Sequence, residues 1–331
     1  MNKVLTICVP TYGRAAILRN TLTELINQAS PHQIEIVISD NSEDELSLDV
    51  YRDLVQIYPN IRYQRNATNV GLDRNFVNAA AMASTEFFWI FGDDDMPVPG
   101  AITKVLEEIN ANPDVEFFLI NSIPVTADLK TQINDNLTGV YQDKIYTDCR
   151  EFLREISWYT TYVGAFVVKR SLWTKVHHER YLDTAFVHVG IVYEGLAAAK
   201  SAAKFVASPL ILYRTGNATW MRNFLNIQLR YWRAVIELLP DYYDNESKRT
   251  AVHRVVERFV DAKAILNLRA DGLLNLPTFR SGIWPYCVYA DKSHLATWKI
   301  LGVSIAALAV PVTAMSWTKT KLKSLLKPKT D

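Results

Sequence analysis

Three consecutive carboxylates follow a strongly apolar run in the first third of the chain. Residues 87–91 read Phe-Phe-Trp-Ile-Phe, and residues 92–95 read Gly-Asp-Asp-Asp. Carboxylates at the end of a buried strand repel one another and are costly to desolvate unless a positive partner lies between them. Mg²⁺ and Mn²⁺ are suitable partners, because they prefer carboxylate oxygens and keep positions open for phosphates. The spacing of Asp93 and Asp95 would let one carboxylate bind a ribose and the other a metal. The alternative is a solvated turn that caps a helix starting near Pro97.

Composition limits the classes of protein to which the chain can belong. Its 331 residues, 49% of them hydrophobic, suffice for one large core or two domains. A net charge of +1 provides no general basic field for nucleic acid. Three scattered cysteines are too few for a disulfide framework or a zinc site. The N-terminus runs directly into an apolar strand pattern without a charged leader. These features predict a protein of the reducing cytoplasm.

Strand and helix patterns alternate along residues 4–120. The apolar runs predict strands at 4–9, 34–39, 61–64, 87–91 and 115–120. Further along the chain, the apolar run at 163–168 predicts another buried strand. Residues at helical spacing predict intervening helices around 17–26, 46–57, 73–83 and 101–109. This alternation is typical of an α/β fold with a mostly parallel sheet that is covered by helices on both faces.

Polar clusters follow four of the predicted strands, at 11–14, 40–42, 66–75 and 92–95. In α/β sheets, ligands bind beyond the carboxyl ends of the strands, so these clusters predict a binding site there. The chain has no Gly-x-Gly-x-x-Gly after the first strand, no P-loop and no Gly-x-Ser-x-Gly. The remaining interpretation is a nucleotide site in which a metal, rather than a glycine loop, holds the diphosphate.

The clusters contain four motifs in a fixed order. They are Pro-Thr-Tyr-Gly-Arg at 10–14, Asp-Asn-Ser at 40–42, Asn-Val-Gly with Arg-Asn between 69 and 75, and Asp-Asp-Asp at 93–95. Together they resemble the motifs of family-two glycosyltransferases with the GT-A fold. The Gly-Asp-Asp-Asp form and the later segment around His188 are similar to the abequosyltransferase-like branch of the O-antigen enzymes.

This resemblance, and the chemistry of the side chains, imply that a nucleotide binds along this edge. The ring of Tyr12 could stack on a base, and Asp40 could accept a hydrogen bond from uracil N3–H or a cytosine amino group. Arg74 would reach the base or the phosphates, and Gly71 would shape the loop through a positive φ. The alternatives are a packed aromatic, an Asx turn and a surface arginine. The residues expected to bind the nucleotide are Pro10, Thr11, Tyr12, Arg14, Asp40, Asn69, Gly71, Arg74, Asp93 and Asp94.

The resemblance also implies a cation, Mn²⁺ or Mg²⁺, held by Asp93, Asp95 and His188. Asp95 is expected to be the principal ligand and therefore essential for catalysis. A neutral imidazole can complete a Mn²⁺ shell, although a lone histidine such as His188 is as often a core residue. No motif identifies the base that would act on the acceptor. Asp183 and Glu194 are the acidic candidates near the site, and an enzyme that retains configuration would need no conventional base.

The chain is expected to comprise a catalytic domain at 1–215, a helical region at 216–295 and a tail at 296–331. Residues 300–317 carry no charge but are interrupted by Pro311. Five lysines follow them: Lys319, Lys321, Lys323, Lys327 and Lys329. This pattern favours a shallow interfacial helix at an anionic membrane over a full span, and the alternative is a core helix with a solvated tail.

The resemblance, together with these features, implies a metal-dependent glycosyltransferase at the inner face of the plasma membrane, peripheral or monotopic. It would transfer a sugar, such as a 3,6-dideoxyhexose of the abequose type, from a CDP- or UDP-sugar to a lipid-linked saccharide for O-antigen or surface polysaccharide. One alternative is a sugar-nucleotide pyrophosphorylase or nucleotidyltransferase, although residues 10–14 lack the glycine-rich loop expected of one. The other is a non-catalytic protein that binds sugar nucleotides.

Overall fold

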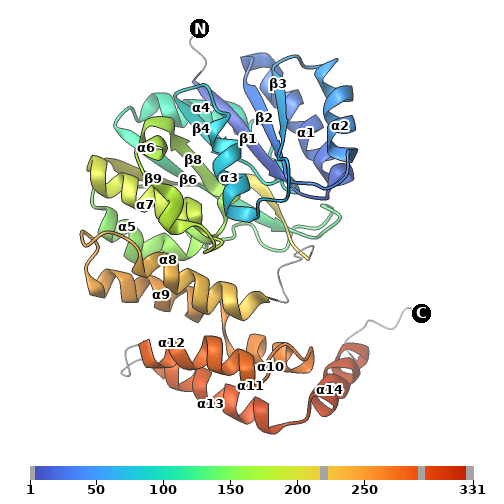
Figure 1. Ribbon diagram of the computed structural model, residues 1–331, viewed down its shortest axis with the longest axis vertical. Helices are drawn as coiled ribbons and strands as arrows, with labels where there is room; N and C mark the ends of the chain where they lie inside the picture. Colours follow the sequence, from blue (N-terminus) through green and yellow to red (C-terminus); the bar gives the residue numbers. More distant parts are fainter. Residues whose placement is uncertain (1–3, 217–222, 290–294, 326–331) are drawn as a thin grey trace. The chain divides into compact units, whose positions relative to one another are not determined.

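The computed structural model describes residues 4–216, 223–289 and 295–325, and the chain forms two compact units (Figure 1). The first unit comprises residues 1–218 and 238–243, and the second comprises residues 219–237 and 244–331. Every residue expected to bind the nucleotide, the metal or the acceptor belongs to the first unit. The expected tail at 296–331 belongs to the second unit together with the preceding helices.

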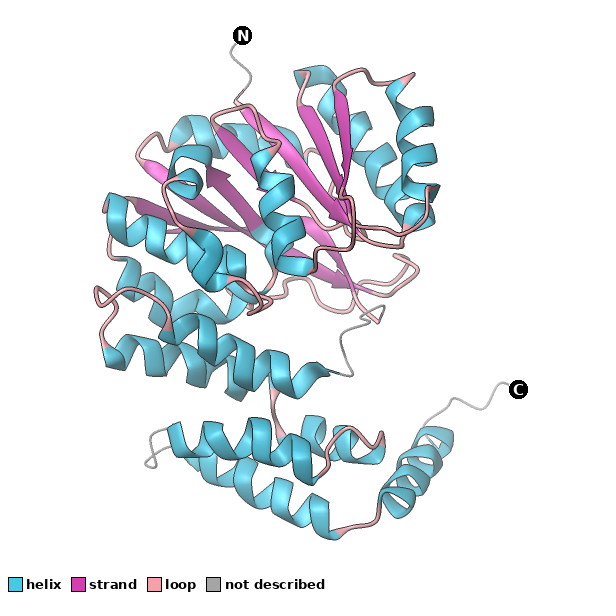
Figure 2. Ribbon diagram, in the orientation of Figure 1, coloured by secondary structure: helices cyan, strands magenta, loops and turns pink. Residues whose placement is uncertain are grey.

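The first unit is a sheet covered by helices on both of its faces (Figure 2). Its strands are β1 (Leu5–Thr11), β2 (Glu35–Asp40), β3 (Ile61–Arg65), β4 (Phe87–Ile90), β5 (Met96–Pro97), β6 (Val115–Val125), β7 (Lys144–Tyr146), β8 (Phe166–Lys169) and β9 (Ala202–Arg214). Its helices are α1 (Ala15–Ala29), α2 (Leu46–Val55), α3 (Leu72–Ala81), α4 (Ala101–Ala111), α5 (Cys149–Ile156), α6 (Arg170–Thr174) and α7 (Val187–Ala199).

The sheet has nine strands in the order β3-β2-β1-β4-β8-β6-β9-β5, with β7 paired to β9. The first four strands of the chain run parallel, and β6 runs parallel to β9. However, β8 lies between β4 and β6 and is antiparallel to both. Six of the nine described strands, β1, β2, β3, β4, β6 and β9, therefore run in one direction, as expected of a mostly parallel sheet, while β5, β7 and β8 are antiparallel to their neighbours. Apolar runs locate strands but do not show which strands become neighbours.

The position of β8 has a consequence for the orientation of its neighbours. Because β8 is antiparallel to both β4 and β6, these two strands point the same way. The C-terminal ends of β1, β2, β3, β4, β6 and β9 consequently lie at one edge of the sheet, which we call the C-terminal edge. This is the edge at which α/β sheets bind ligands.

The helices bury both faces of the sheet, which explains the nearly continuous apolar strands. Helices α3 and α7 pack together on one face, while α1 contacts α2 and α4 on the other (Figure 1). Residues 5–9 of β1 and 36–38 of β2 are accordingly buried whichever face they point to. Such runs are expected where a strand is covered on both sides.

One predicted strand is only half formed. The pattern at 163–168 favoured a continuous strand, but Val163–Ala165 is a short 3₁₀ turn and the strand begins at Phe166. The carbonyl of Gly164 accepts a hydrogen bond from the indole of Trp89 at 2.8 Å instead of joining a ladder. The turn brings the Tyr162 ring against Gly164, where a Cβ would lie 2.6 Å from the Tyr162 hydroxyl oxygen.

The second unit is helical. After a wide π-helical turn at Asn226–Tyr231, its helices are α8 (Trp232–Glu237), α9 (Asn245–Phe259), α10 (Ala262–Ala270), α11 (Leu276–Thr278), α12 (Trp284–Tyr289), α13 (Leu295–Ala309) and α14 (Val312–Leu325). The carboxylates of Asp244 and Asp261 cap α9 and α10 by accepting backbone N–H bonds of 2.7 Å each. Such caps satisfy N–H groups that a helix start leaves without partners.

The apolar run at 300–317 forms parts of two helices rather than one. Helices α13 and α14 meet at Pro311, with a bend of 104°. Within the described parts of the chain, no single helix is long and apolar enough to cross a membrane; α13 and α14 meet that criterion only as a bent pair. One side of α13 is buried through Ile300 and Ala307, whereas Trp298 and Ile305 are each 54% exposed. Lys327 and Lys329 of the predicted basic tail lie outside the described residues.

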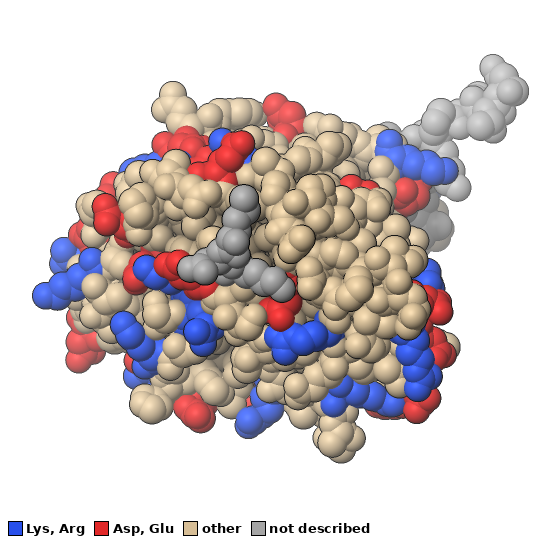
Figure 3. Space-filling view, turned by 90° about the horizontal axis from the view of Figure 1, so that it is seen from above, with Lys and Arg blue, Asp and Glu red and all other residues tan. Residues whose placement is uncertain are grey.

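Charged side chains of both signs are visible on one face of the molecule. On the face shown in Figure 3, acidic and basic side chains are interspersed between broad areas without charge. This view is compatible with the net charge of +1.

Candidate active site

The three aspartates form a turn directly after β4, at the C-terminal edge. We call residues 92–95 the aspartate turn. Asp93 and Asp95 are 7% and 3% exposed. The turn is fixed from α1, because the Thr21 hydroxyl bonds to the carbonyls of Asp93 and Asp95 at 3.0 Å each. A glycine must precede the aspartates, since a Cβ at Gly92 would lie 2.5 Å from Oδ2 of Asp95.

Asp93 and Asp94 face a cation supplied by the chain itself. The guanidinium of Arg14, at the start of α1, lies 3.2 Å from Oδ1 of Asp93 and 2.6 Å from Oδ2 of Asp94. The Thr11 hydroxyl donates to Oδ2 of Asp93 at 2.7 Å. Two residues of the motif at 10–14 therefore contact the carboxylates of the motif at 93–95. Arg14 reduces the repulsion between these carboxylates but does not contact Asp95.

Asp95 is held by residues from the second half of the unit. The Tyr162 hydroxyl donates to its Oδ2 at 2.5 Å, and the backbone N–H of Arg214 donates to its Oδ1 at 3.0 Å. The ring of Tyr162 packs edge-on against Tyr213, with 4.8 Å between ring centroids. Sequence reasoning missed Tyr162, Tyr213, Arg214 and Thr21 as parts of the site, because none of them lies in a motif.

Burial makes these two carboxylates hard to ionise. Burial, reinforced by the charge of Asp94, raises the pKa of Asp93 to about 6, although Arg14 and Thr11 act in the opposite direction. The same two causes raise the pKa of Asp95 to about 7, against the hydrogen bonds from Tyr162 and Arg214. Carboxylates with raised pKa values at a ligand-binding edge are typical of functional sites.

The donor set suits a hard divalent cation bound together with a substrate. Within the described residues, no three His, Cys, Asp or Glu side chains come together as a metal site. Mg²⁺ is usually held by one or two carboxylates plus substrate phosphates, so a pair of carboxylates such as Asp93 and Asp95 would be enough protein ligands for it. Their oxygens are of the type that Mg²⁺ and Mn²⁺ prefer.

His188 is not brought together with Asp93 and Asp95. It lies in the first turn of α7, is 1% exposed, and its Nε2 lies 3.2 Å from the carbonyl oxygen of Thr160. Its ring packs edge-on against Phe76 and Phe166. Burial lowers its pKa to about 3, so the imidazole is neutral. In this structure His188 is a core histidine, which was the alternative interpretation of this residue.

The residues expected to bind the base take two different positions. Tyr12 follows β1 and is 50% exposed, so its ring is available for stacking. Asp40, at the end of β2, is fully buried. Its Oδ1 accepts from the Ser42 N–H at 2.8 Å and its Oδ2 from the Tyr63 hydroxyl at 2.7 Å. Asp40 therefore already shapes the end of β2, in the manner of the Asx turn that was its alternative role.

A network of asparagines joins the strand ends to α3. Asn41 donates to Asn69 at 2.6 Å, and its own Oδ1 accepts from the Val70 N–H at 2.9 Å. Asn75 donates to the Thr11 carbonyl at 3.2 Å, and its Oδ1 accepts from Ser39 at 2.8 Å. The loop between these residues turns at Gly71, whose φ of +83° confirms the expected positive value. The network fixes the nucleotide edge before any ligand binds.

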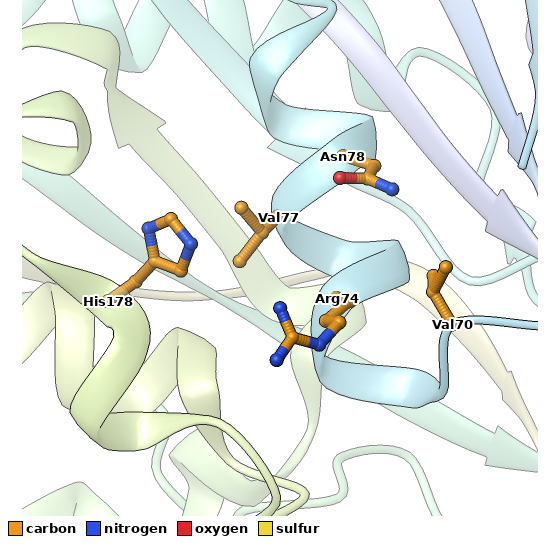
Figure 4. A pocket seen from close by; sticks show the side chains of 5 residues that line it. All are labelled: Val70, Arg74, Val77, Asn78 and His178. Carbon is orange, nitrogen blue, oxygen red and sulfur yellow. The ribbon is translucent and has the colours of Figure 1, made fainter.

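Two cavities flank this network. The first, of about 680 Å³, lies at the ends of β2 and β3 and is lined by Ser42, Glu43, Arg65, Asn66, Ala67, Thr68 and Asn69. Arg65, one of its lining residues, donates to the carbonyls of Ser42 and Glu43. The second, of about 250 Å³, lies between α3 and the segment before α7, where the exposed Arg74 faces His178 (Figure 4). Sequence reasoning gave no role to His178 or Arg65.

Asp183 lies on a strained loop that is tied to α3. Asp183 and Ala185 have φ values of +63° and +61°, which residues other than glycine rarely adopt. The buried carboxylate of Asp73, near the start of α3, accepts from the N–H groups of Ala185 and Val187 at 2.9 and 3.2 Å. This tie holds the exposed Asp183 beside the start of α3. Backbone strain of this kind persists where surrounding contacts impose it, often at functional sites.

Glu194, the other acidic candidate, is engaged elsewhere. Its Oε2 pairs with the guanidinium of Arg180 and accepts a hydrogen bond from the Tyr181 hydroxyl at 2.7 Å. Gly190 lets the Tyr181 ring approach α7, because a Cβ there would lie 2.3 Å from the ring. Glu194 thus holds the segment before α7 in place.

Comparisons with known proteins agree with this geometry. The sequence model of the family described as "Glycosyl transferase family 2" matches residues 6–175. The chain is 26% identical over 269 residues to abequosyltransferase RfbV of Salmonella typhimurium, which covers 77% of this chain and 79% of RfbV.

Solved structures show the same fold. Staphylococcus aureus TarS (residues 1–349) in complex with UDP-GlcNAc has a TM-score of 0.57 at 12% identity, covering 96% of this chain and 92% of that one. Mannosyltransferase PcManGT from Pyrobaculum calidifontis, in complex with GDP-Man and Mn²⁺, has a TM-score of 0.51 at 16% identity, covering 99% of this chain and 82% of that one. The expected GT-A fold is thereby confirmed.

Proposed function

The chain belongs to glycosyl transferase family 2, and we propose that it moves a sugar from a pyrimidine nucleoside diphosphate to a saccharide on a lipid carrier. That it is a glycosyltransferase follows from the family and from its relative RfbV. The observation that carries the finer proposal is the aspartate turn. It presents two buried carboxylates with raised pKa values at the edge where this fold binds nucleotides.

On the donor side, we propose that the base stacks on Tyr12 and enters the cavity at the ends of β2 and β3. Asp40 would support this site indirectly, by accepting hydrogen bonds that hold Ser42 and Tyr63 in place. The likeness to an abequosyltransferase favours CDP over UDP, and a 3,6-dideoxyhexose such as abequose as the sugar. O-antigen or another surface polysaccharide would be the product.

The reaction requires that negative charge on the departing nucleoside diphosphate be stabilised. We propose that Asp95 and Asp93 hold Mn²⁺ or Mg²⁺; the bound ion would supply positive charge beside the two phosphates. The Mn²⁺ in the PcManGT complex supports this assignment. Asp95 would be the principal ligand, because Arg14 already neutralises Asp93 and Asp94 but leaves Asp95 without a cation. Tyr162 and the Arg214 N–H fix its orientation.

On the acceptor side, Asp183 is the proposed base. It is exposed, and its loop is fastened through Asp73 to the start of α3, next to the nucleotide edge. Its carboxylate would take the proton from the attacking hydroxyl if the anomeric configuration is inverted. Glu194 is the weaker candidate, since its carboxylate is paired with Arg180.

We further propose that the enzyme associates peripherally with the cytoplasmic face of the plasma membrane, where a lipid-linked acceptor would be found. The uncovered side of α13 carries Trp298 and Ile305, and Trp317 of α14 is 64% exposed beside Lys321. Indole rings favour the membrane interface, and lysines close to an anionic surface add about 1 kcal/mol each.

A thermal-shift screen tests the proposal directly. CDP, UDP, GDP and dTDP are each added with and without Mn²⁺, and turnover is then measured with the sugar nucleotides of the bases that bind. We expect stabilisation by CDP or UDP that increases with Mn²⁺, followed by sugar transfer. Binding without any turnover would favour the non-catalytic alternative. Release of pyrophosphate from a sugar phosphate and a nucleoside triphosphate would identify a nucleotidyltransferase instead.

A further inference from the structure

A long, well-organised loop begins at the same edge as the aspartate turn. It comprises residues 126–143, between β6 and β7, and we call it the β6–β7 loop. It leaves the C-terminal end of β6, which points the same way as β4 because β8 is antiparallel to both. Loops of this length without helices or strands are uncommon in compact domains and are usually functional. No residue of this loop belongs to the four motifs at the donor edge.

The first part of the loop is held back against β6. Gln132 bridges to Val125, and the N–H groups of Ile133 and Leu137 donate to the carbonyls of Pro124 and Ser122 at 2.8 Å each. The backbone of the loop therefore continues the sheet beside β6 rather than extending into solvent.

Buried asparagines organise the second part. Asn121, which is fully buried in β6, donates to Oδ1 of Asn136 at 2.8 Å. Asn136 in turn accepts from the N–H groups of Thr138 and Gly139 and donates to the Val140 carbonyl. These bonds fix the loop in one conformation without a ligand, which is a requirement for a precise binding surface.

The outer surface of the loop combines apolar and acidic groups. Ile133 and Val140 are 51% and 36% exposed, and Tyr141 is 67% exposed. The Tyr141 hydroxyl lies 3.3 Å from Oδ1 of Asp135. An open aromatic ring next to a carboxylate can bind a sugar, because the ring covers the C–H face and the carboxylate accepts from hydroxyls. Three apolar side chains form too small an area for a stable protein interface.

Arg214, at the end of β9, joins this loop to the aspartate turn. Its Nε donates to the carbonyl of Asp94 and its Nη1 to the carbonyl of Ala127, both at 2.6 Å. Its backbone N–H donates to Oδ1 of Asp95 at 3.0 Å. The next residue, Thr215, donates from its N–H and its hydroxyl to the Val125 carbonyl. One arginine therefore contacts both the aspartate turn and the loop.

We propose that the β6–β7 loop binds the saccharide of the acceptor, and that Arg214 is a positioning residue that couples this loop to the aspartate turn. The inference rests on the proposed function, since it presumes a nucleotide site at that turn. Any shift of Asp94 or Asp95 that accompanies nucleotide binding is transmitted through the Arg214 guanidinium to Ala127, because both carbonyls share the same planar group.

Hydrogen–deuterium exchange on the full chain tests the coupling. CDP or UDP with Mn²⁺ is expected to slow amide exchange at residues 126–131 by about fivefold or more in the wild type. Arg214→Gln should abolish that protection while the nucleotide still raises Tm. Arg214→Lys, which can satisfy one carbonyl, should restore part of it. If the nucleotide raises the wild-type Tm but leaves exchange in the loop unchanged, the coupling is wrong. If no nucleotide raises Tm, the proposed function fails first.

Saturation-transfer NMR tests the ligand class. Octyl glycosides of galactose, mannose, rhamnose and N-acetylglucosamine are added to the nucleotide-bound protein. We expect saturation of the ring protons of at least one of them, and a loss of most of that signal in Tyr141→Ala. Tyr242→Ala, which alters another exposed tyrosine of the same unit (43% exposed), is the matched control. Equal signals in Tyr141→Ala and wild type, or no glycoside bound by the wild type, would overturn the assignment.

Discussion

The hydroxyl of Tyr162 donates a 2.5 Å hydrogen bond to Oδ2 of Asp95, a residue 67 positions earlier in the chain. Two glycines make room for this contact. Gly92 leaves space for the carboxylate and Gly164 for the phenol ring. The last carboxylate of the aspartate turn is therefore oriented before any ligand arrives.

Tyr162→Phe tests what this orientation contributes. The substitution keeps the packing against Tyr213 but removes the donor, so Asp95 should bind Mn²⁺ less well. Loss of an outer hydrogen bond to a metal ligand typically costs about 10- to 100-fold in metal affinity. Titration with Mn²⁺ in the presence of CDP or UDP should show a loss on this scale. Tyr242→Phe, remote from the turn in sequence, should bind Mn²⁺ like the wild type.

Asp95→Asn should reduce sugar transfer by about a hundredfold or more, the scale expected when a main electrostatic element is lost. The amide keeps the shape of the side chain but removes the charge that holds the cation. Circular dichroism should show an intact fold. Asp53→Asn, which alters an exposed carboxylate paired with Arg19, provides the control. Full activity in Asp95→Asn, or in the presence of a chelator, would contradict the metal assignment.

The raised pKa values of Asp93 and Asp95 predict how stability depends on pH without metal. A carboxyl whose pKa is raised on folding favours the folded state only while it stays protonated. Its contribution is present at low pH and is lost as the pH rises through about 6 for Asp93 and about 7 for Asp95. Asp95→Asn should therefore gain Tm relative to wild type between pH 5 and 8. A constant difference across that range would refute this account.

Substitutions of Tyr12 and Asp40 should have different effects on stability, although both should weaken nucleotide binding. Tyr12 is half exposed, so Tyr12→Ala should leave Tm nearly unchanged but remove most of the stabilisation by CDP or UDP. Asp40→Ala leaves the buried Ser42 N–H without its acceptor, which typically costs about 1–3 kcal/mol, and it also removes the acceptor of the partly buried Tyr63 hydroxyl. It should lower Tm as well as abolish the nucleotide effect. Stabilisation by GDP alone would rule out a pyrimidine donor.

Membrane association should depend on the uncovered side of α13. Trp298→Ser with Ile305→Ser should reduce binding to anionic liposomes at low salt, because both side chains are about half exposed on this helix. The same variant should lose more activity on a lipid-linked acceptor than on a soluble one. Ile57→Ser, at a 74% exposed position of the first unit, is the control. If the wild-type protein does not bind anionic liposomes, the proposed membrane association is wrong.

Local sequence was sufficient to predict much of this architecture. The strands ending near Thr11, Asp40 and Asp93 were predicted within a few residues, because a strand buried on both faces is a distinct apolar run. The motif residues Thr11, Arg14 and Asp93 were correctly grouped at one edge, and the structure shows them in contact.

What the sequence did not reveal depends on distant neighbours. Tyr162 and Arg214 contact Asp95 from 67 and 119 residues away, and nothing in their local sequence marks them. His188 was expected to bind metal, but its role depends on Phe76 and Phe166, which surround it only in the fold. The sequence likewise did not show that the candidate base Glu194 pairs with Arg180. Sequence patterns gave the positions of these groups, and packing decided their roles.

The antiparallel strand β8 also sets the order in which the molecule can be completed during synthesis. A nascent chain produces β1, β4 and the three aspartates early, but the second edge of β4 has no partner strand until β8 has emerged from the ribosome. Asp95 then waits for Arg214, at the far end of β9. A chain released before that point leaves an edge of the sheet open to aggregation and a turn whose carboxylates have only Arg14 as a counter-ion. The aspartate turn is thus made early in synthesis but is completed only when β9 is in place.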